Sequence, residues 1–185
     1  KEAFYYMARV IDEGLSKREL EDVIDNDDFS KYGNALTNFS SQLSTSQSLL
    51  AMNVLKDPYR LDFVTLERGY DEHDLESAIA KDITRFLLEL GSGFTYVGRQ
   101  PEFVVGNEGY FPDLLFYHIR LRCYVVIELK VVDFKPEFAG KLNFYVTACN
   151  KLLRQPEDNP TIGLLLCKSK DQTKVEWAFD SIQNP

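Results

Sequence analysis

The fold of this chain is decided by residues 111–130, FPDLLFYHIRLRCYVVIELK. The second half of this stretch is rich in β-branched and aromatic residues, which is typical of a strand. We expect two strands joined by a tight turn centred near Arg120 and Leu121. The antiparallel register that this turn imposes places Asp113 directly opposite Glu128 on one face of the sheet.

Two carboxylates that face each other in an apolar sheet need a physical reason, because like charges on cross-strand neighbours are destabilising. A divalent cation is the best explanation, since hard cations take carboxylate oxygens as ligands. Lys130 lies two residues beyond Glu128 and shares its face, so it would add a positive charge beside a bound metal. The alternative is structural, because Glu-Leu-Lys often ends a strand and Pro-Asp often starts a turn.

Length and composition are those of a globular protein. The chain has 185 residues, of which 44% are hydrophobic and 13% aromatic, enough for a sizeable core. It begins with Lys1, so we expect a fragment of a longer protein. No run approaches the 18 or more apolar residues of a membrane span. The three cysteines show no CxxC spacing, which indicates buried thiols in a reducing compartment, and we expect a cytoplasmic protein.

The formal net charge of −8 argues against nucleic-acid binding by the whole surface. The excess acid lies in residues 1–93, with 18 Asp and Glu against 10 Lys and Arg, whereas residues 94–185 hold 11 of each. The second half can therefore carry a basic rim, for which an ordinary mixed surface is the alternative. Its candidate members are Arg99, Arg120, Arg122, Lys135, Lys141, Lys151, Arg154, Lys168 and Lys170.

The first part of the chain is expected to be helical. Apolar spacing predicts a helix over residues 2–13, and Ser16 with Glu19 forms a capping-box pattern before a second, acidic helix. An acidic helix fits a DNA groove poorly, so we expect an interaction or oligomerisation segment there. Polar residues 29–48 indicate an ordered loop or linker, and a short helical piece follows at 49–55. We expect a boundary near 60–70, dividing a helical segment, 1–66, from a domain, 67–185.

The second part alternates helices and strands. The pattern predicts helices over 72–90 and 137–153, strands at 94–97, 102–105 and 162–167, and a last edge strand at 174–179. Residues 106–109 are expected to form a turn. Glu76 lies in the first of these helices beside its apolar stripe, where a first-turn acid favouring the helix dipole is the alternative to a functional role. His73 and His118 are expected to lie on the surface or in turns.

This order of elements, with Asp113 and the triplet Glu128-Leu129-Lys130, resembles the PD-(D/E)XK nuclease superfamily. Residues 72–180 resemble its YhcG-like bacterial branch, and residues 1–66 resemble the end of that branch's N-terminal domain. The segments that carry the resemblance include Gly98-Arg99-Gln100, residues 134–140, Asn143-Phe144-Tyr145 and residues 158–167. It implies an α/β fold with a restriction-endonuclease-like αβββαβ core, a mixed central sheet flanked by helices and a small helical N-terminal segment.

The resemblance also implies a site. Asp113, Glu128 and the backbone carbonyl of Leu129 would hold Mg²⁺ or Mn²⁺, together with the helix acid Glu76. Lys130 would position or activate the attacking water and stabilise phosphate charge. The remaining implied residues are Gln100 beside the site and Arg99, Tyr145 and Lys141 as nucleic-acid contacts. One departure is that Lys141 and Asn143 stand where some branches carry a Gln ahead of the Tyr.

We therefore expect a metal-dependent nuclease that hydrolyses phosphodiester bonds, in DNA, in the service of repair, recombination or defence. The alternative is a catalytically silent module that keeps the nuclease fold and binds nucleic acid or assembles with proteins. Either could form a homo-oligomer or bind a protein partner through the N-terminal helices, and neither needs a membrane.

Overall fold

The structure is a computed structural model that describes residues 2–25, 27–31, 36–55, 59, 70–180 and 182–185. Its centre is a four-stranded mixed sheet with the strand order β1-β4-β5-β6. The strands are β1 (Phe94–Arg99), β4 (Leu114–His118), β5 (Cys123–Lys130) and β6 (Ile162–Cys167). β4 pairs antiparallel with β1 and β5, and β6 pairs parallel with β5. The expected mixed sheet flanked by helices is confirmed.

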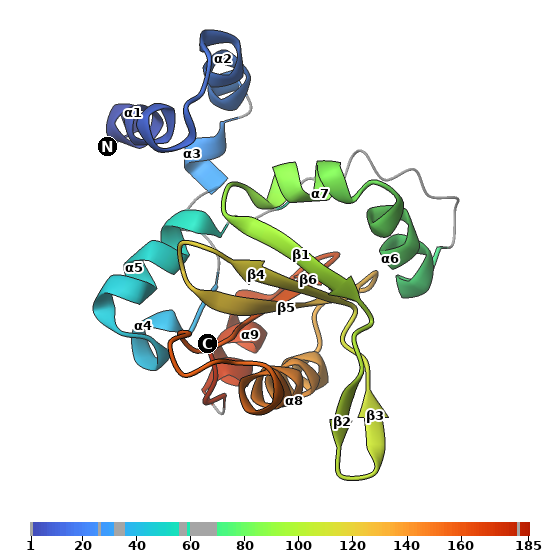
Figure 1. The fold of residues 1–185 in the computed structure, drawn as a ribbon. Helices are drawn as coiled ribbons and strands as arrows, with labels where there is room; N and C mark the ends of the chain where they lie inside the picture. Colours follow the sequence, from blue (N-terminus) through green and yellow to red (C-terminus); the bar gives the residue numbers. More distant parts are fainter. Residues whose placement is uncertain (1, 26, 32–35, 56–58, 60–69, 181) are drawn as a thin grey trace.

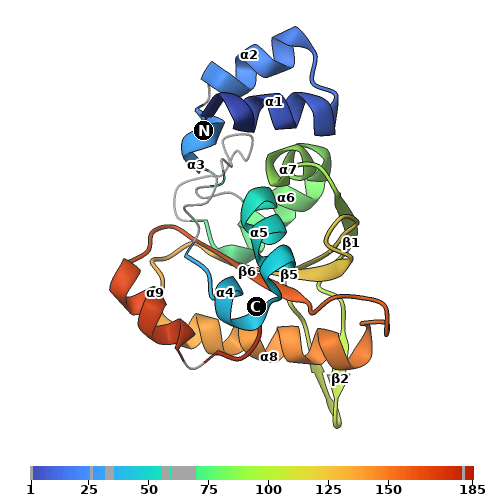
Figure 2. The ribbon, with the colours of Figure 1, turned by 90° about the vertical axis from the view of Figure 1, so that its left-hand side faces the viewer.

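Helices cover both faces of this sheet (Figures 1 and 2). One face carries α5 (Thr45–Val54), α6 (Glu72–Lys81) and α7 (Ile83–Leu90), and the other carries α8 (Pro136–Leu152). Each face has its own apolar core, because successive side chains of a strand point to opposite faces. In β5, Val125 and Ile127 pack with the first group of helices, whereas Val126 packs with α8.

The other elements lie around this centre. They are α1 (Glu2–Glu13), α2 (Lys17–Asp25), α3 (Asp28–Lys31), α4 (Phe39–Gln42), a separate hairpin of β2 (Phe103–Val105) and β3 (Glu108–Tyr110), and α9 (Gln172–Phe179). Helices α1 to α3 lie beyond the sheet, near α7 (Figure 1). The expected division between residues 66 and 67 lies outside the described residues, as does most of the 60–70 segment. No described helix is long and apolar enough to cross a membrane.

The register of the central hairpin is the one that the sequence predicts. Leu114 pairs with Ile127 and His118 with Cys123, so the next pair outward is Asp113 and Glu128. The turn closes with the Arg122 backbone N–H donating to the carbonyl oxygen of Ile119 at 3.3 Å. Because a shift by one residue would move every side chain to the other face, the buried pattern on both sides of β5 holds this register.

Several expected elements differ in the structure. The single helix over 72–90 is two helices that meet at Asp82, whose side chain accepts from the Arg85 N–H. The expected turn at 106–109 is shorter, because Glu108 already belongs to β3. Residues 29–48, expected as a loop or linker, contain most of α3, all of α4 and the start of α5.

The expected edge strand at 174–179 is wrong, since these residues belong to α9. Asp171 caps this helix by accepting from the Lys174 N–H at 2.9 Å. Val175 is buried in a small cluster with Phe134, whereas Trp177 is 73% exposed. Alternation of polar and apolar residues over so short a segment does not distinguish a strand from a helix with one buried stripe.

His118, expected at the surface or in a turn, is fully buried. Its Nδ1 accepts a hydrogen bond from the Leu121 N–H at 3.0 Å, which helps to close the β4–β5 turn. Burial lowers the pKa of His118 to about 4, so the ring is neutral at physiological pH. Its position near the end of β4 made it look like a turn residue, but the ring points into the core.

Gly93 is required by this buried ring. It has a φ of 95°, and a Cβ atom there would lie 2.9 Å from Cε1 and Nε2 of His118. Gly93→Ala is therefore expected to lower the free energy of unfolding by about 2–4 kcal/mol, from backbone strain and overpacking. Urea unfolding would measure this loss. The matched control is Gly140→Ala in α8, where nothing lies within 4 Å, and a gain of about 0.5–1 kcal/mol is expected. Equal stability of the two variants would contradict the prediction.

Candidate active site

The candidate site lies at the end of β5, on the face of the sheet that α8 covers. Glu128 is 1% exposed, and its Oε2 receives two lysines, with Lys141 Nζ at 3.0 Å and Lys130 Nζ at 3.5 Å. Its other oxygen, Oε1, is buried and has no hydrogen-bond partner. A buried carboxylate oxygen without a partner is costly, so this atom marks a position where a positively charged ligand would be stabilising.

Asp113 is fixed beside Glu128 by the backbone of β5. Its Oδ2 accepts from the Leu129 N–H at 2.7 Å, and its own carbonyl accepts from the Gln100 N–H at 3.0 Å. Burial, and next the charge of Glu128, raise the pKa of Asp113 to about 6. A buried aspartate whose pKa is raised by burial and by a neighbouring carboxylate is a group that a bound cation would stabilise.

Lys130 is held over the same group of atoms. Its Nζ donates to the Leu129 carbonyl oxygen at 2.8 Å, and the ammonium lies 5.6 Å from the ring centroid of Phe138. The side chain is only 12% exposed. The predicted set of Asp113, Glu128, Leu129 and Lys130 is therefore brought together. Oxygens of this kind fit Mg²⁺ or Mn²⁺, which prefer carboxylate and carbonyl ligands.

Lys141 and Tyr145 come from α8, one turn apart. Lys141 Nζ lies 5.2 Å from the centroid of the Tyr145 ring, and Tyr145 itself is 5% exposed. The sequence suggested nucleic-acid contacts for both. The structure places Lys141 on Glu128, with its side chain 46% exposed, so its charge faces the carboxylates and solvent together. Tyr145 is mainly a core residue that supports this lysine.

Glu76 lies in a second cluster next to the first. It is 2% exposed, and its carboxylate accepts from Arg99 Nε and, at 2.8 Å, from Gln100 Nε2. Arg99 also donates to Ser77 Oγ at 3.1 Å. Glu76 is thus paired with Arg99 and Gln100. Among the described residues, no group of three or more His, Cys, Asp and Glu side chains is placed to hold a metal ion.

Two members of this second cluster were not predicted from the sequence. Ser77 is one, and the other is His73, whose Nδ1 lies 3.4 Å from Arg99 Nη2. The available signal was helical spacing, since His73 stands three residues before Glu76 and so lies on the same side of α6. Arg99 is the residue that unites them, and it ends β1 immediately before the site.

The positive φ of 45° at Gln100 turns the chain out of β1 beside Asp113. A non-glycine residue with a positive φ is uncommon and costs energy. The Gln100 side chain and backbone are both used, on Glu76 and Asp113 respectively. This turn is therefore the physical link between the two clusters.

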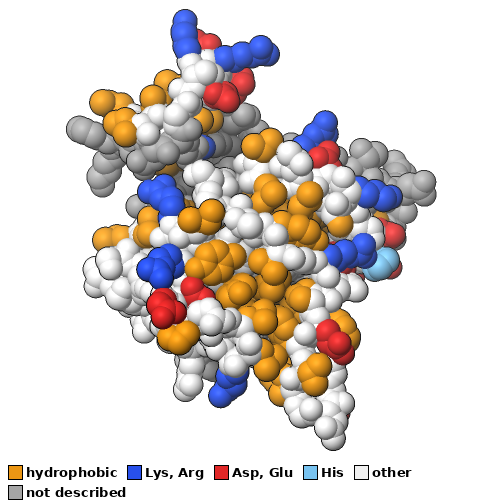
Figure 3. Space-filling model, in the orientation of Figure 1, with side chains coloured by type: hydrophobic (Ala, Val, Ile, Leu, Met, Phe, Trp, Pro, Cys, Tyr) orange, Lys and Arg blue, Asp and Glu red, His pale blue; other side chains and the backbone are white. Residues whose placement is uncertain are grey.

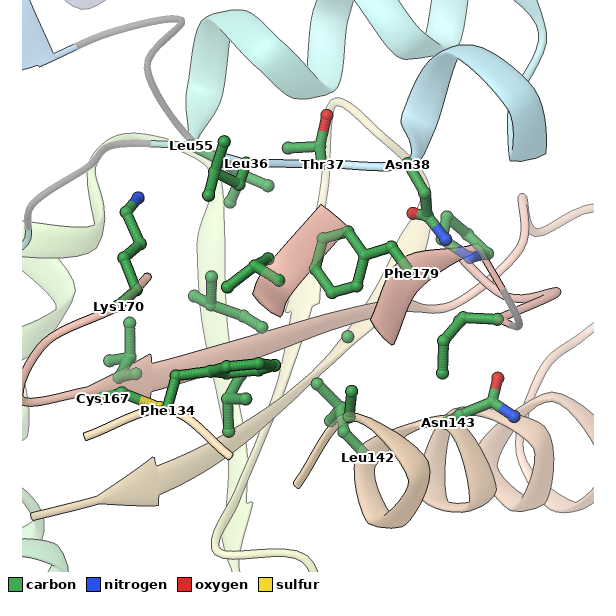
Figure 4. Close-up of a pocket in the computed structure, with 18 of the residues that line it drawn as sticks. Leu36, Thr37, Asn38, Leu55, Phe134, Leu142, Asn143, Cys167, Lys170 and Phe179 are labelled. Atoms are coloured by element: carbon green, nitrogen blue, oxygen red, sulfur yellow. The ribbon is translucent and has the colours of Figure 1, made fainter. Parts of the chain in front are cut away.

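An apolar cavity of about 550 Å³ lies elsewhere, along β6 (Figure 4). Phe134, Leu142 and Phe179 point toward its interior. Its described lining residues include no Asp, Glu or His. The cavity therefore offers no described side-chain carboxylate to hold a hard cation, and the candidate site remains at the end of β5.

The pKa of Asp113 predicts how pH affects stability. In an unfolded chain an aspartate titrates near 4, so folding takes up a proton between about pH 4 and pH 6. The metal-free protein should therefore lose stability as the pH rises through this window. Asp113→Asn is expected to remove that loss and to raise the free energy of unfolding at about pH 7 by roughly 1–2 kcal/mol.

Urea unfolding in a chelator, at several values between about pH 4 and pH 8, would check this prediction. Asp22→Asn, an exposed change on α2, is the matched control and should follow the wild-type curve. Parallel curves for wild type and Asp113→Asn would show that Asp113 is not the group responsible.

The PD-(D/E)XK class of nuclease folds is defined by a mixed sheet between helices, with an Asp on one strand facing a Glu-x-Lys sequence at the end of the next. Here these residues are Asp113 and Glu128 to Lys130. The family described as "YhcG PDDEXK nuclease domain" matches residues 52–185. The chain belongs to this family.

The chain is also similar to individual proteins. The Escherichia coli (strain K12) protein named "Putative nuclease YhcG" is 36% identical over 136 residues, which cover 74% of this chain and 36% of that protein. The chain therefore matches only about a third of its relative's length. A solved structure, "crystal structure of a repair endonuclease from Pyrococcus abyssi", aligns with a TM-score of 0.40 and 17% identity, over 62% of this chain and 45% of that one.

Proposed function

We propose that this chain is a divalent-metal-dependent nuclease that hydrolyses phosphodiester bonds in DNA. The observation that carries the proposal is the buried, unpaired Oε1 of Glu128 beside Asp113, next to the ammonium of Lys130. Asp113, Glu128 and the Leu129 carbonyl would hold Mg²⁺ or Mn²⁺. When bound, such an ion supplies a water of lowered pKa and neutralises charge on the phosphate.

The chain's own residues divide the remaining work. Lys130 holds the attacking water and stabilises the charge that develops on the phosphate oxygens. Lys141, which faces both Glu128 and solvent, binds a phosphate at the entrance. Arg99 is oriented by Glu76 and supplies a further positive side chain for the phosphates, in addition to Lys141. In this proposal Glu76 acts through Arg99 and Gln100, and the Glu76→Gln variant tests whether it also binds metal.

The proposal includes the narrower expectations from the sequence. These are a role in DNA repair, recombination or defence, a cytoplasmic location, a division into residues 1–66 and 67–185, and contact with a partner or a second copy through the N-terminal helices. The acidic helix α2 supports a protein partner over DNA, since its four acidic residues outnumber Lys17 and Arg18 and its last turn carries no basic residue.

Calorimetric titration with Mn²⁺ is the first experiment. One ion should bind to the wild type, and Asp113→Asn should weaken that binding strongly. Incubation with single-stranded, duplex and branched DNA and with RNA should then give cleavage that needs the metal. Absence of Mn²⁺ binding would reject the metal-dependent enzyme and leave the silent module. Mn²⁺ binding without cleavage of any of these substrates would also favour the catalytically silent module.

A further inference from the structure

The β2–β3 hairpin is inserted in the sequence between two residues of the candidate site, Gln100 and Asp113. It leaves the sheet after Gln100 and returns just before Asp113, and it projects beyond the sheet (Figure 1). Residues 101–112 contain Glu102 and Glu108 but no Lys or Arg. An acidic arm repels a phosphate backbone. We therefore expect the hairpin to contact the bases of a nucleic acid and not its phosphate backbone.

A row of aromatic rings runs from this hairpin to the carboxylates. The rings of Tyr110 on β3 and Phe144 on α8 have centroids 4.7 Å apart, and Phe144 lies 6.2 Å from Tyr145. Lys141 Nζ lies 5.2 Å from the Tyr145 ring and donates to Glu128 at 3.0 Å. The row therefore ends at the candidate metal site.

The outer rings of this row, Tyr110 and Phe144, are partly exposed to solvent. Phe144 is 37% exposed. The Tyr110 hydroxyl donates to Glu108 Oε2 at 2.7 Å, which fixes its ring. Hydrophobic side chains form a continuous stretch toward the hairpin (Figure 3).

We propose that Tyr110 and Phe144 form a stacking surface for unpaired nucleobases, so that the substrate is single-stranded or locally unpaired nucleic acid. This inference rests on the proposed function. Bases stack on aromatic side chains whatever their identity, because every base has a π-face. In a paired duplex those faces are already stacked and are not available. Lys141 lies one helical turn before Phe144, so a nucleotide can place its phosphate on Lys141 and its base on Phe144.

The experiment measures binding by fluorescence anisotropy in Ca²⁺, with three DNA probes of equal length. They are a single strand, the same strand with abasic sites in place of its central nucleotides, and a blunt duplex. The wild type should bind the normal strand roughly tenfold more tightly than the abasic strand or the duplex. Phe144→Ala should remove this preference by weakening only the binding of the normal strand.

Three further variants serve as controls. Phe144→Tyr keeps an aromatic face and should keep the preference, whereas Phe144→Leu keeps apolar volume and should lose it. Trp177→Ala removes an aromatic residue that is 73% exposed on α9 and should change nothing. Urea unfolding of each variant checks that the fold is kept.

The outcomes separate the two proposals. If the wild type neither binds nor cleaves any of the probes, the proposed nuclease function fails. If it binds or cleaves but treats normal and abasic strands alike, the stacking surface is wrong and the nuclease proposal stands. If Phe144→Ala instead changes the mass of the protein in sedimentation with strand binding intact, the surface is a protein interface and the stacking proposal is rejected.

Discussion

Lys130→Ala should reduce metal-dependent cleavage by about 10²–10³-fold, the usual cost of removing one positioned charge from a transition state. Lys130 Nζ lies 2.8 Å from the Leu129 carbonyl oxygen and 3.5 Å from Glu128 Oε2. In the proposed function, its charge stabilises the negative charge that develops on the phosphate. Because Lys141 still neutralises Glu128 in the variant, the fold should be kept.

Single-turnover cleavage at saturating metal, together with the Mn²⁺ dissociation constant, is the measurement. The rate should fall while the metal still binds within a few-fold of wild type. Lys151→Ala, an exposed change in the last turn of the same helix as Lys141, should leave the rate unchanged. Intact cleavage by Lys130→Ala would remove this lysine from the catalytic set.

The centre of the site could be predicted from sequence because strand pairing is a local problem. A short turn at Arg120 and Leu121 fixes the register of two adjacent strands, and the register alone sets Asp113 against Glu128. Alternation in a strand then places Lys130 on the same side as Glu128. None of these steps needs knowledge of the distant parts of the chain.

The surroundings of the site could not be predicted in this way. Glu76, Arg99 and Gln100 meet across 23 or more positions of sequence, and only the packing of α6 on the sheet decides which of them pair. The resemblance supplied Glu76, Arg99 and Gln100 as site residues, but not that they pair with one another. Likewise Lys141 reaches Glu128 because α8 crosses the end of β5, a tertiary placement that helical periodicity does not contain.

The prediction of a strand at residues 174–179 was wrong for a related reason. Its alternating pattern is compatible with a strand, and the choice of a helix rests on the Asp171 cap and on a buried position for Val175. The capping signal, Asp three residues before Lys174, was present in the sequence. It is short-range and weak, and tertiary burial decided between the two structures.

Glu128→Gln should give the largest loss of metal affinity, at least about 100-fold, because it removes the buried charge that a hard cation needs. Glu128 is 1% exposed and its Oε1 has no partner in the protein, so the amide would present a neutral group to the ion. Cleavage should fall to background. Mn²⁺ calorimetry measures the first effect, and Glu137→Gln, an exposed acid in the first turn of α8, is the control.

Glu76→Gln gives the matched comparison, since it also neutralises a buried carboxylate near the site. Glu76 is occupied by Arg99 and Gln100, so its loss should leave Mn²⁺ affinity within about fivefold and should weaken nucleic-acid binding instead, because Arg99 loses its anchor. A loss of metal affinity as large as that of Glu128→Gln would make Glu76 a metal ligand, as the family resemblance implies. The two variants together therefore define which carboxylates bind the ion and which one orients the arginine.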